Sequence, residues 1–159
     1  MTTETRVENG VLIVTRTYNA SRELVFEAWV NTSQVQQWWG CLECTSVRSE
    51  IEPKVGGHYN HHMTIDKVGN VCTFATLTEY DPPRRLSYTT PLPGDDSVVM
   101  TVKVTFTESL NGTCVRLEQA GIPNIRVDGN QDLREIIRSG WSAAFDKLAR
   151  LLGSGVKKN

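Results

Sequence analysis

A long amphipathic stretch near the C-terminus, from about residue 130 to residue 152, sets the strongest limit on the possible folds of this chain. Its apolar residues keep the 3.6-residue period of an α-helix for about six turns, and Gly153 supplies a stop after them. These residues are Leu133, Ile136, Ile137, Trp141, Ala144, Phe145, Leu148, Leu151 and Leu152. Such a helix spans roughly 33 Å at about 1.5 Å per residue, so it needs an equally long apolar surface to cover it.

The middle of the chain supplies that surface, because the pattern from Cys44 to Gln119 changes to the two-residue period of β-strands. Asn111-Gly112 is the strongest hairpin signal, since both central residues of a type I′ turn need positive φ. Short links of this kind predict a mostly antiparallel sheet with one apolar and one polar face. Strands are expected near 44–51, 57–66, 71–80, 85–90, 97–107 and 113–119.

The N-terminal part is predicted to form one strand and two short helices. Residues 11–18 are β-branched and partly alternating, which is typical of a strand. Ser21 is the expected N-cap of a helix over 22–30, and Thr32 or Ser33 that of a second helix through 34–39. The order is therefore strand, two helices, six strands and a long helix, which predicts a single α+β domain over 1–159.

Composition excludes several classes of partner. Seventeen basic and 18 acidic residues give a net charge of −1, which builds no basic face for nucleic acid. No apolar run approaches the ~20 residues that a membrane span needs, and no apolar segment follows the first residues as in a secretory signal. We therefore expect a cytoplasmic protein, in which Cys41, Cys44, Cys72 and Cys114 are reduced thiols.

An ordered set of motifs covers nearly the whole chain and resembles a known family. The motifs are RTYNASRELVFEAWVNTSQVQQWWG (16–40), VGGHYNHHM (55–63), EYDPPRRLSYT (79–89), VKVTF (102–106) and SGWSAAFDKLARLL (139–152). Together they resemble the AHSA-like family, relatives of the C-terminal domain of the heat-shock protein 90 ATPase activator. The resemblance implies the helix-grip fold of the START-like (SRPBCC, Bet v-like) superfamily, a seven-stranded antiparallel sheet wrapped around a long C-terminal helix.

Two positions depart from the pattern of that family. Cys41 stands where proline usually follows Trp-Trp-Gly, and His61 stands where an apolar or aromatic residue is common. This fold serves lipid carriers, polyketide cyclases, ligand-sequestering proteins and co-chaperone domains. The resemblance therefore indicates the fold but does not indicate which of these activities the protein has.

Cys41-x2-Cys44 and His58-x3-His62 together match the spacing of a zinc finger. In such a finger the two histidines lie on a helix, whereas here Gly56 and Gly57 lead into a predicted strand. On a strand, His58 and His62 would stand roughly 13 Å apart at about 3.3 Å per residue, too far to share one ion. The sequence therefore predicts no metal site and no cofactor.

Alternation along the strand 57–66 divides its three histidines between two faces. Tyr59, His61 and Met63 share the more apolar face, which is expected to point inward, while His58 and His62 are expected to face solvent. His61 is then either a core histidine bonded to a neighbour, or a polar group in an apolar cavity. In a cavity it could donate a hydrogen bond to a ligand or act as a general base.

The leading hypothesis is a cavity between the sheet and the long helix that binds a small hydrophobic or aromatic molecule. Gly140 favours it, since glycine costs about 1 kcal/mol inside a helix and indicates either a close approach of another element or room for a ligand. Of the adjacent Trp38 and Trp39, one is expected to close the core and the other to form a cavity lid or a partner contact. The cavity residues are expected to be Tyr59, His61, Met63, Met100, Val102, Phe106, Ile137, Trp141 and Phe145.

Two alternatives rest on the resemblance. One is a protein that binds a chaperone, as the activator's domain does, and the other is a cyclase-type enzyme that uses His61. No set of nucleophile, base and orienting residue is evident from the spacing, so no catalytic residue is assigned and the prediction leans away from an enzyme. The fold is compatible with a monomer or a homodimer.

Overall fold

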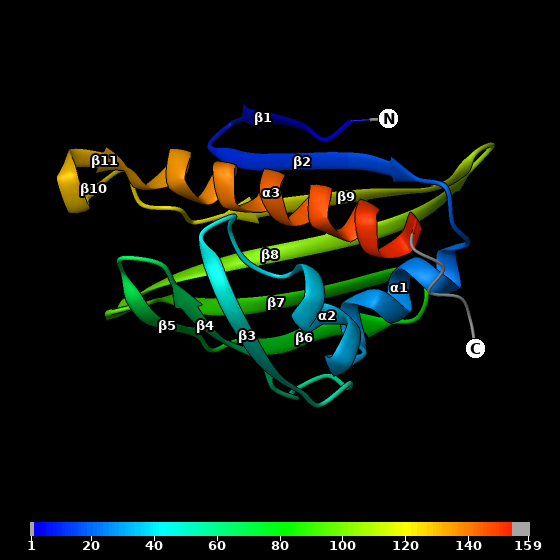
Figure 1. The fold of residues 1–159 in the computed structure, drawn as a ribbon, viewed down its shortest axis with the longest axis horizontal. Coiled ribbons are helices and arrows are strands. Elements are labelled where there is room, and N and C mark those ends of the chain that lie inside the picture. The colour runs from blue at the N-terminus through cyan, green and yellow to red at the C-terminus, as the bar shows by residue number, and fades with distance from the viewer. Residues whose placement is uncertain (1, 154–159) are drawn as a thin grey trace.

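The long helix α3 (Leu133–Gly153) lies across one face of an antiparallel sheet, as its apolar stripe predicts (Figure 1). This arrangement is seen in a computed structural model that describes residues 2–153. Before α3 the chain forms β1 (Glu4–Glu8), β2 (Val11–Tyr18), α1 (Arg22–Val30), α2 (Thr32–Trp38), β3 (Cys44–Ile51), β4 (Tyr59–Ile65), β5 (Gly69–Thr73), β6 (Thr76–Asp81), β7 (Arg85–Leu92), β8 (Asp95–Ser109), β9 (Gly112–Ala120), β10 (Arg126–Val127), a 3₁₀ turn (Asp128–Asn130) and β11 (Gln131–Asp132).

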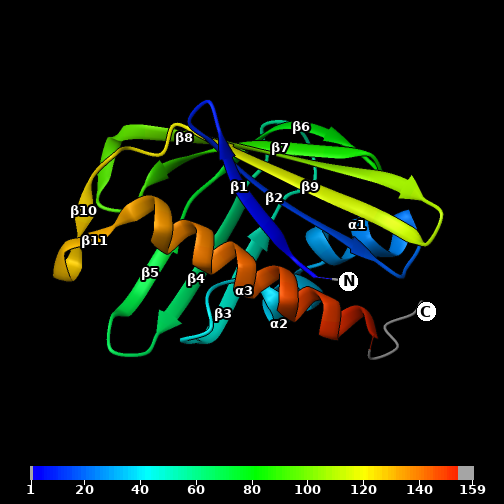
Figure 2. The same ribbon diagram turned by 90° about the horizontal axis from the view of Figure 1, so that it is seen from above.

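The strands form two main antiparallel sheets that enclose the helix from two sides (Figure 2). The larger sheet has the order β1-β2-β9-β8-β7-β6, the smaller one has the order β3-β4-β5, and β10 pairs with β11 in a short hairpin before α3. The predicted α+β class is confirmed, as is the order of the predicted elements. The single seven-stranded sheet is wrong in strand count, because the described residues hold nine strands in these two sheets.

Two differences account for that count. The strand β1 was not predicted, because its residues Glu4–Glu8 lie at the exposed edge of the sheet and carry no alternating apolar pattern. The predicted strand 71–80 is in fact β5 and β6, because the chain crosses from the small sheet to the large one between them. At the crossing the Tyr59 N–H donates to the Ala75 carbonyl at 2.9 Å, and the Ala75 N–H donates to Asn60 Oδ1 at 3.0 Å.

The helix starts follow capping chemistry, with one correction. The Leu24 N–H donates to Ser21 Oγ at 3.3 Å, as expected for α1. The N-cap of α2 is Asn31 rather than Thr32 or Ser33, since Asn31 Oδ1 accepts from the Gln34 N–H at 3.2 Å. Asn31 also ends α1, so one residue both closes the first helix and opens the second.

The core between α3 and the large sheet is filled at one end by aromatic rings. Trp29 of α1 is fully buried, with ring centroids 4.6 Å from Trp38, 5.9 Å from Phe106 and 6.1 Å from Phe145. The Tyr18 hydroxyl donates to the Phe145 carbonyl at 3.0 Å and so ties β2 to α3. The helix is therefore held firmly at this end of the sheet.

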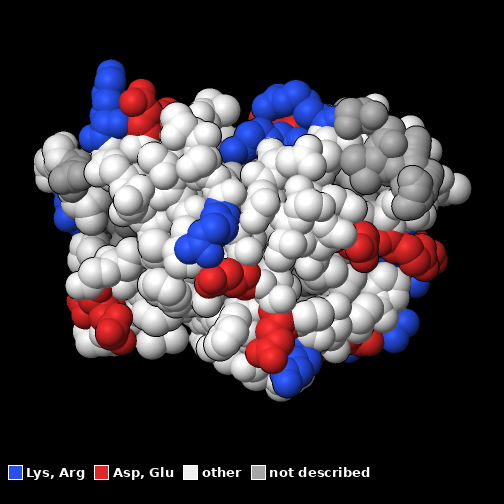
Figure 3. Space-filling view, turned by 60° about the horizontal axis from the view of Figure 1, so that its bottom comes forward, with Lys and Arg blue, Asp and Glu red and all other residues white. Residues whose placement is uncertain are grey.

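The surface carries charges of both signs. In the face shown in Figure 3, acidic and basic side chains of the described residues are interspersed rather than gathered by sign. Among the described residues, no helix is long and apolar enough to cross a membrane.

Candidate functional site

A cavity of about 300 Å³ lies between α3 and the strands, toward the end of the helix that the aromatic core leaves unfilled. Seven of the nine residues predicted from the sequence line it: Tyr59, His61, Met63, Met100, Val102, Ile137 and Trp141. Gly140 also lies in the wall, and a β-carbon added there would meet nothing within 4 Å. The glycine therefore leaves room in the cavity and is not a close approach of another element.

Phe106 and Phe145 do not line the cavity, so their place in the predicted set is wrong. Both are buried on the expected faces of β8 and α3, but they pack around Trp29 at the filled end of the core. Periodicity assigns a residue to a face, and it does not show how far along that face another element fills the space.

Several wall residues were not predicted, and they come from elements whose sequence gave no cavity signal. The Trp141 indole N–H donates to Gln119 Oε1 at 2.7 Å, and Gln119 Nε2 lies 3.4 Å from Met100 Sδ, which fixes Trp141 in the wall. The adjacent tryptophans divide much as expected, with Trp38 in the core and Trp39 in the cavity wall, although both are buried. Thr73, Tyr88, Thr90 and Gln119 are the unpredicted lining residues that bear aromatic or polar groups.

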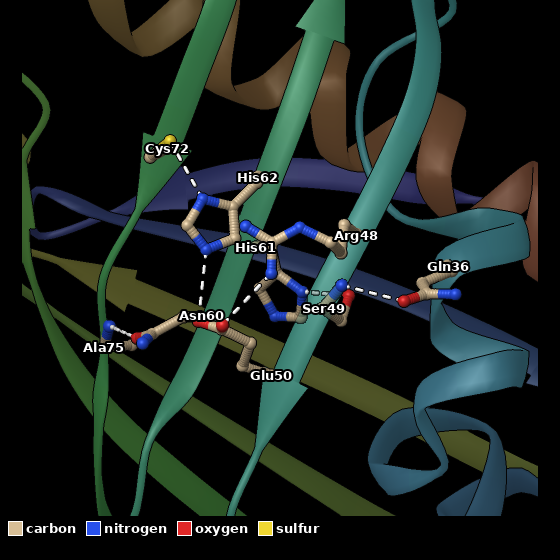
Figure 4. A network of polar contacts seen from close by, with 9 residues as sticks. All are labelled: Gln36, Arg48, Ser49, Glu50, Asn60, His61, His62, Cys72 and Ala75. Carbon is tan, nitrogen blue, oxygen red and sulfur yellow. Dashed lines mark hydrogen bonds and ion pairs between the residues drawn. The ribbon is translucent and has the colours of Figure 1, made fainter.

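His61 is the central polar residue of this wall and is only 1% exposed. Its ring stacks on Trp39 at a centroid distance of 3.7 Å and an angle of 19°. Its Nδ1 lies 2.8 Å from Ser49 Oγ of β3, and the Ser49 backbone N–H in turn donates to Gln36 Oε1 of α2 at 2.9 Å (Figure 4). The imidazole is thereby held in one orientation by groups from β3 and α2.

The other ring nitrogen of His61, Nε2, is buried and has no partner among the described residues. Burial, together with nearby His62, lowers the pKa of His61 to about 3, so the ring is neutral at physiological pH. A neutral imidazole carries one donor and one acceptor nitrogen, and Ser49 occupies only one of them. An orphaned buried polar atom costs roughly 1–3 kcal/mol, so Nε2 is a place where a ligand group would gain a hydrogen bond.

A second unpartnered polar atom lies beside it. Thr73 of β5 is the direct cross-strand neighbour of His61, and its buried Oγ1 also lacks a partner among the described residues. Directly paired residues place their β-carbons about 4.5–5.5 Å apart on the same face of the sheet. His61 and Thr73 therefore offer two neighbouring hydrogen-bonding groups in an otherwise mostly apolar wall.

The loop after α2 closes the wall near Trp39. Lys147 Nζ donates to the Trp39 carbonyl at 3.0 Å and to the Cys41 carbonyl at 3.3 Å. Gly40 has φ +89°, and an added β-carbon would lie 3.0 Å from Cys44 Sγ. Burial raises the pKa of both the Cys41 and the Cys44 thiol. These two cysteines are packed parts of the loop, and all four cysteines of the chain are free thiols.

The other two histidines lie outside the cavity wall. His58 is exposed, as expected, whereas His62 is half-buried and bonded to Cys72 and Glu50 on the outer face of the small sheet. Within residues 2–153, no group of three or more His, Cys, Asp or Glu side chains is arranged to hold a metal ion.

Comparison with known proteins places this geometry in a wider group. The family model described as "Activator of Hsp90 ATPase homolog 1-like protein" matches residues 19–153. No curated protein sequence gives a significant match.

Solved structures with the same fold are numerous. A crystal structure of a protein from Chromobacterium violaceum is similar with a TM-score of 0.75 and 20% identity, over 91% of this chain and 97% of that one. A solution structure from Arthrobacter aurescens has a TM-score of 0.77 and 16% identity, over 98% and 93%. A protein from Mesorhizobium loti has a TM-score of 0.70 and 24% identity, over 92% and 99%. At such identities the likeness establishes the fold alone, which is the helix-grip fold.

Proposed function

This chain belongs to the family of activator of Hsp90 ATPase homolog 1-like proteins, and we propose that it binds one small, mostly apolar molecule in the cavity beneath α3. The observation that carries the proposal is the unpartnered Nε2 of His61, which is buried in the wall of that cavity. Burying this atom without a partner costs desolvation free energy. A hydrogen bond to a bound ligand would offset that cost.

The size and lining of the cavity define the class of ligand. A cavity of about 150 Å³ suffices for one benzene ring, so 300 Å³ accommodates two fused rings, or one ring with a short chain. Trp39, Tyr59 and Trp141 supply aromatic surface, which favours a flat aromatic ligand. One carbonyl or hydroxyl group on that ligand would satisfy both His61 Nε2 and Thr73 Oγ1, whose β-carbons are neighbours across the strands.

The chemistry of His61 suits binding better than catalysis. A general base works best when its pKa lies near the operating pH, and burial lowers the pKa of His61 to about 3. In the free protein this imidazole is therefore a hydrogen-bonding group and a poor acceptor of protons. The cyclase and chaperone-binding roles stay predictions from resemblance.

The test is a thermal-shift screen against neutral bicyclic aromatics that carry one carbonyl or hydroxyl group, followed by titration of tryptophan fluorescence. A ligand that binds only the native state raises its melting temperature by mass action. Trp39 and Trp141 line the cavity, so their emission reports occupancy directly.

Two variants locate the binding. His61→Phe keeps an aromatic ring against Trp39 but removes Nε2, and it should weaken binding about ten-fold, the equivalent of one hydrogen bond of about 1.4 kcal/mol. Gly140→Leu should block the cavity from the helix side. His58→Phe, on the exposed side of the same region, is the matched control. The proposal would be refuted if the ligands found bind His61→Phe and Gly140→Leu as tightly as they bind the wild type, or if the screen finds no ligand.

A further inference from the structure

A second polar cluster lies on the outer face of the small sheet, on the side away from the cavity wall. It consists of Glu50 from β3, His62 from β4 and Cys72 from β5 (Figure 4). His62 and Cys72 are direct cross-strand partners, and Arg48 is the partner of His62 on the other side. The strand register therefore brings together side chains that lie far apart in the sequence.

The two ring nitrogens of His62 bond to different groups. Nδ1 lies 3.1 Å from Cys72 Sγ, and Nε2 lies 3.1 Å from Glu50 Oε1. An ionised carboxylate only accepts hydrogen bonds, so Nε2 carries a proton, and in the neutral ring the lone pair of Nδ1 then faces the thiol. Thiol, imidazole and carboxylate thus stand in the order of nucleophile, base and orienting group.

The carboxylate is held in place and kept ionised. Arg48 Nη1 donates to Glu50 Oε2 at 3.0 Å, while His62 bonds to Oε1 of the same group. These hydrogen bonds, first from His62 and then from Arg48, lower the pKa of Glu50. Phe74 packs against the imidazole edge at a ring distance of 5.7 Å and an angle of 83°. The imidazole is therefore positioned from three sides.

This arrangement is a relay rather than a metal site. Cys72 and Glu50 bond to opposite nitrogens of one ring, so a single ion could not bind both of them and the ring together. Cys72 is half-buried and lies in the wall of a groove of about 400 Å³ between β5 and the β7–β8 turn. The groove also contains Phe74, Leu92 and Asp96, so a small molecule bound in it would lie beside Cys72.

We propose that Cys72 is a nucleophilic thiol that exchanges with disulfides of low molecular weight. The Cys72 proton passes to His62 Nδ1, and the thiolate attacks one sulfur of the disulfide. A bond forms between Cys72 Sγ and that sulfur, the original S–S bond breaks, and the departing thiolate takes the proton from His62. The small disulfide is the oxidant, and the products are a mixed disulfide on Cys72 and one free thiol.

Exchange with a disulfide needs a thiolate and access, and it needs no group to stabilise an oxyanion, so the three side chains suffice. Charged groups of this cluster and of the groove include Arg48 and Glu50 from β3 and Asp96 from β8. Their signs are mixed, which favours a neutral disulfide as the probe.

Cys114 provides an internal control for the reaction. It is also half-buried, but it lies in the large sheet between Thr17 and Thr107 and away from the histidines. An ordinary cysteine is only a few per cent thiolate at pH 7, so assistance by His62 should make Cys72 about ten-fold faster than Cys114.

The experiment treats the full chain with the disulfide of 2-mercaptoethanol, quenches at timed intervals and measures each cysteine by peptide mass spectrometry. In His62→Gln, the rate at Cys72 should fall about ten-fold at pH 7 and converge with that of the wild type above about pH 9, where solvent deprotonates ordinary thiols. Glu50→Gln should give an intermediate rate, because it removes only the orienting charge. His58→Gln, an exposed histidine near the same sheet, should change nothing.

Equal rates at Cys72 in wild type and His62→Gln at pH 7 would overturn the proposal, as would a Cys72 no faster than Cys114. A uniform loss of rate at every pH would assign His62 a merely structural role and would also overturn it. Circular dichroism and melting temperature report whether each variant is folded. Should His62→Gln not fold, the exposed Glu50→Gln variant decides by the same pH comparison.

Discussion

Acidification from pH 7 to pH 5 should destabilise the protein through His61. Burial, together with nearby His62, lowers the pKa of His61 to about 3, whereas a histidine in the unfolded chain has a pKa near the usual value of about 6.5. Between these values the unfolded state binds a proton that the folded state does not. The free energy of unfolding therefore falls as the pH drops below about 6.5, and it continues to fall down to about pH 3.

The magnitude follows from the same linkage. Each pH unit below the unfolded value contributes about 1.4 kcal/mol, so the loss at pH 5 is about 2 kcal/mol. Protonation of carboxylates changes the free energy of unfolding little between pH 7 and pH 5. The pKa values of Glu79 and Asp81 are lowered by hydrogen bonds from Arg85 and Arg84, so the stability that they contribute is lost mainly below about pH 5.

Urea unfolding at pH 7 and pH 5, followed by tryptophan fluorescence, measures this loss. The comparison variant is Ser49→Ala combined with His61→Phe, because the double change leaves no unpartnered serine hydroxyl where the 2.8 Å contact was. It should lose about 2 kcal/mol less than the wild type between the two pH values, while His58→Gln should behave as the wild type does. The same pH dependence in wild type and double variant would refute the assignment of a neutral, buried His61.

Three further changes test the fold and the cavity, each by the free energy of unfolding in urea. Gly140→Ala should stabilise the protein by about 1 kcal/mol, because alanine favours the helix and the added β-carbon meets nothing within 4 Å; a loss of stability would contradict the open space there. Asn31→Ala should lower the free energy of unfolding by about 1 kcal/mol, whereas Thr32→Ala should change it little; the opposite result would identify Thr32 as the N-cap of α2. Trp29→Ala should cost about 3–5 kcal/mol because it empties the aromatic core, and a cost below about 1 kcal/mol would contradict its packing.

Local pattern was sufficient to predict most of the elements and the face of the sheet or helix on which their side chains lie. The 3.6-residue period of α3 and the two-residue period of β4 depend only on backbone geometry, so alternation alone places His61 inward and His58 outward, as the structure confirms. The edge strand β1 was missed because its residues are mostly exposed, and periodicity detects only elements that bury one face.

The candidate sites depended on contacts between distant segments. Phe106 and Phe145 share their faces with cavity residues, and only the position of Trp29 shows that they belong to the filled end of the core. Trp39 stacks on His61 because the loop after α2 folds back to Lys147, which no spacing in the sequence reveals.

Periodicity is a property of neighbouring residues, and it is enough to predict the α+β class, the long helix and the apolar faces. Contacts between distant segments leave His61 Nε2 without a partner among the described residues, and they bring Glu50, His62 and Cys72 together on three adjacent strands. Both features depend on strand register, which is set by the turns and by the burial of one whole face of the sheet. A slip of one residue would send every side chain of a strand to the opposite face.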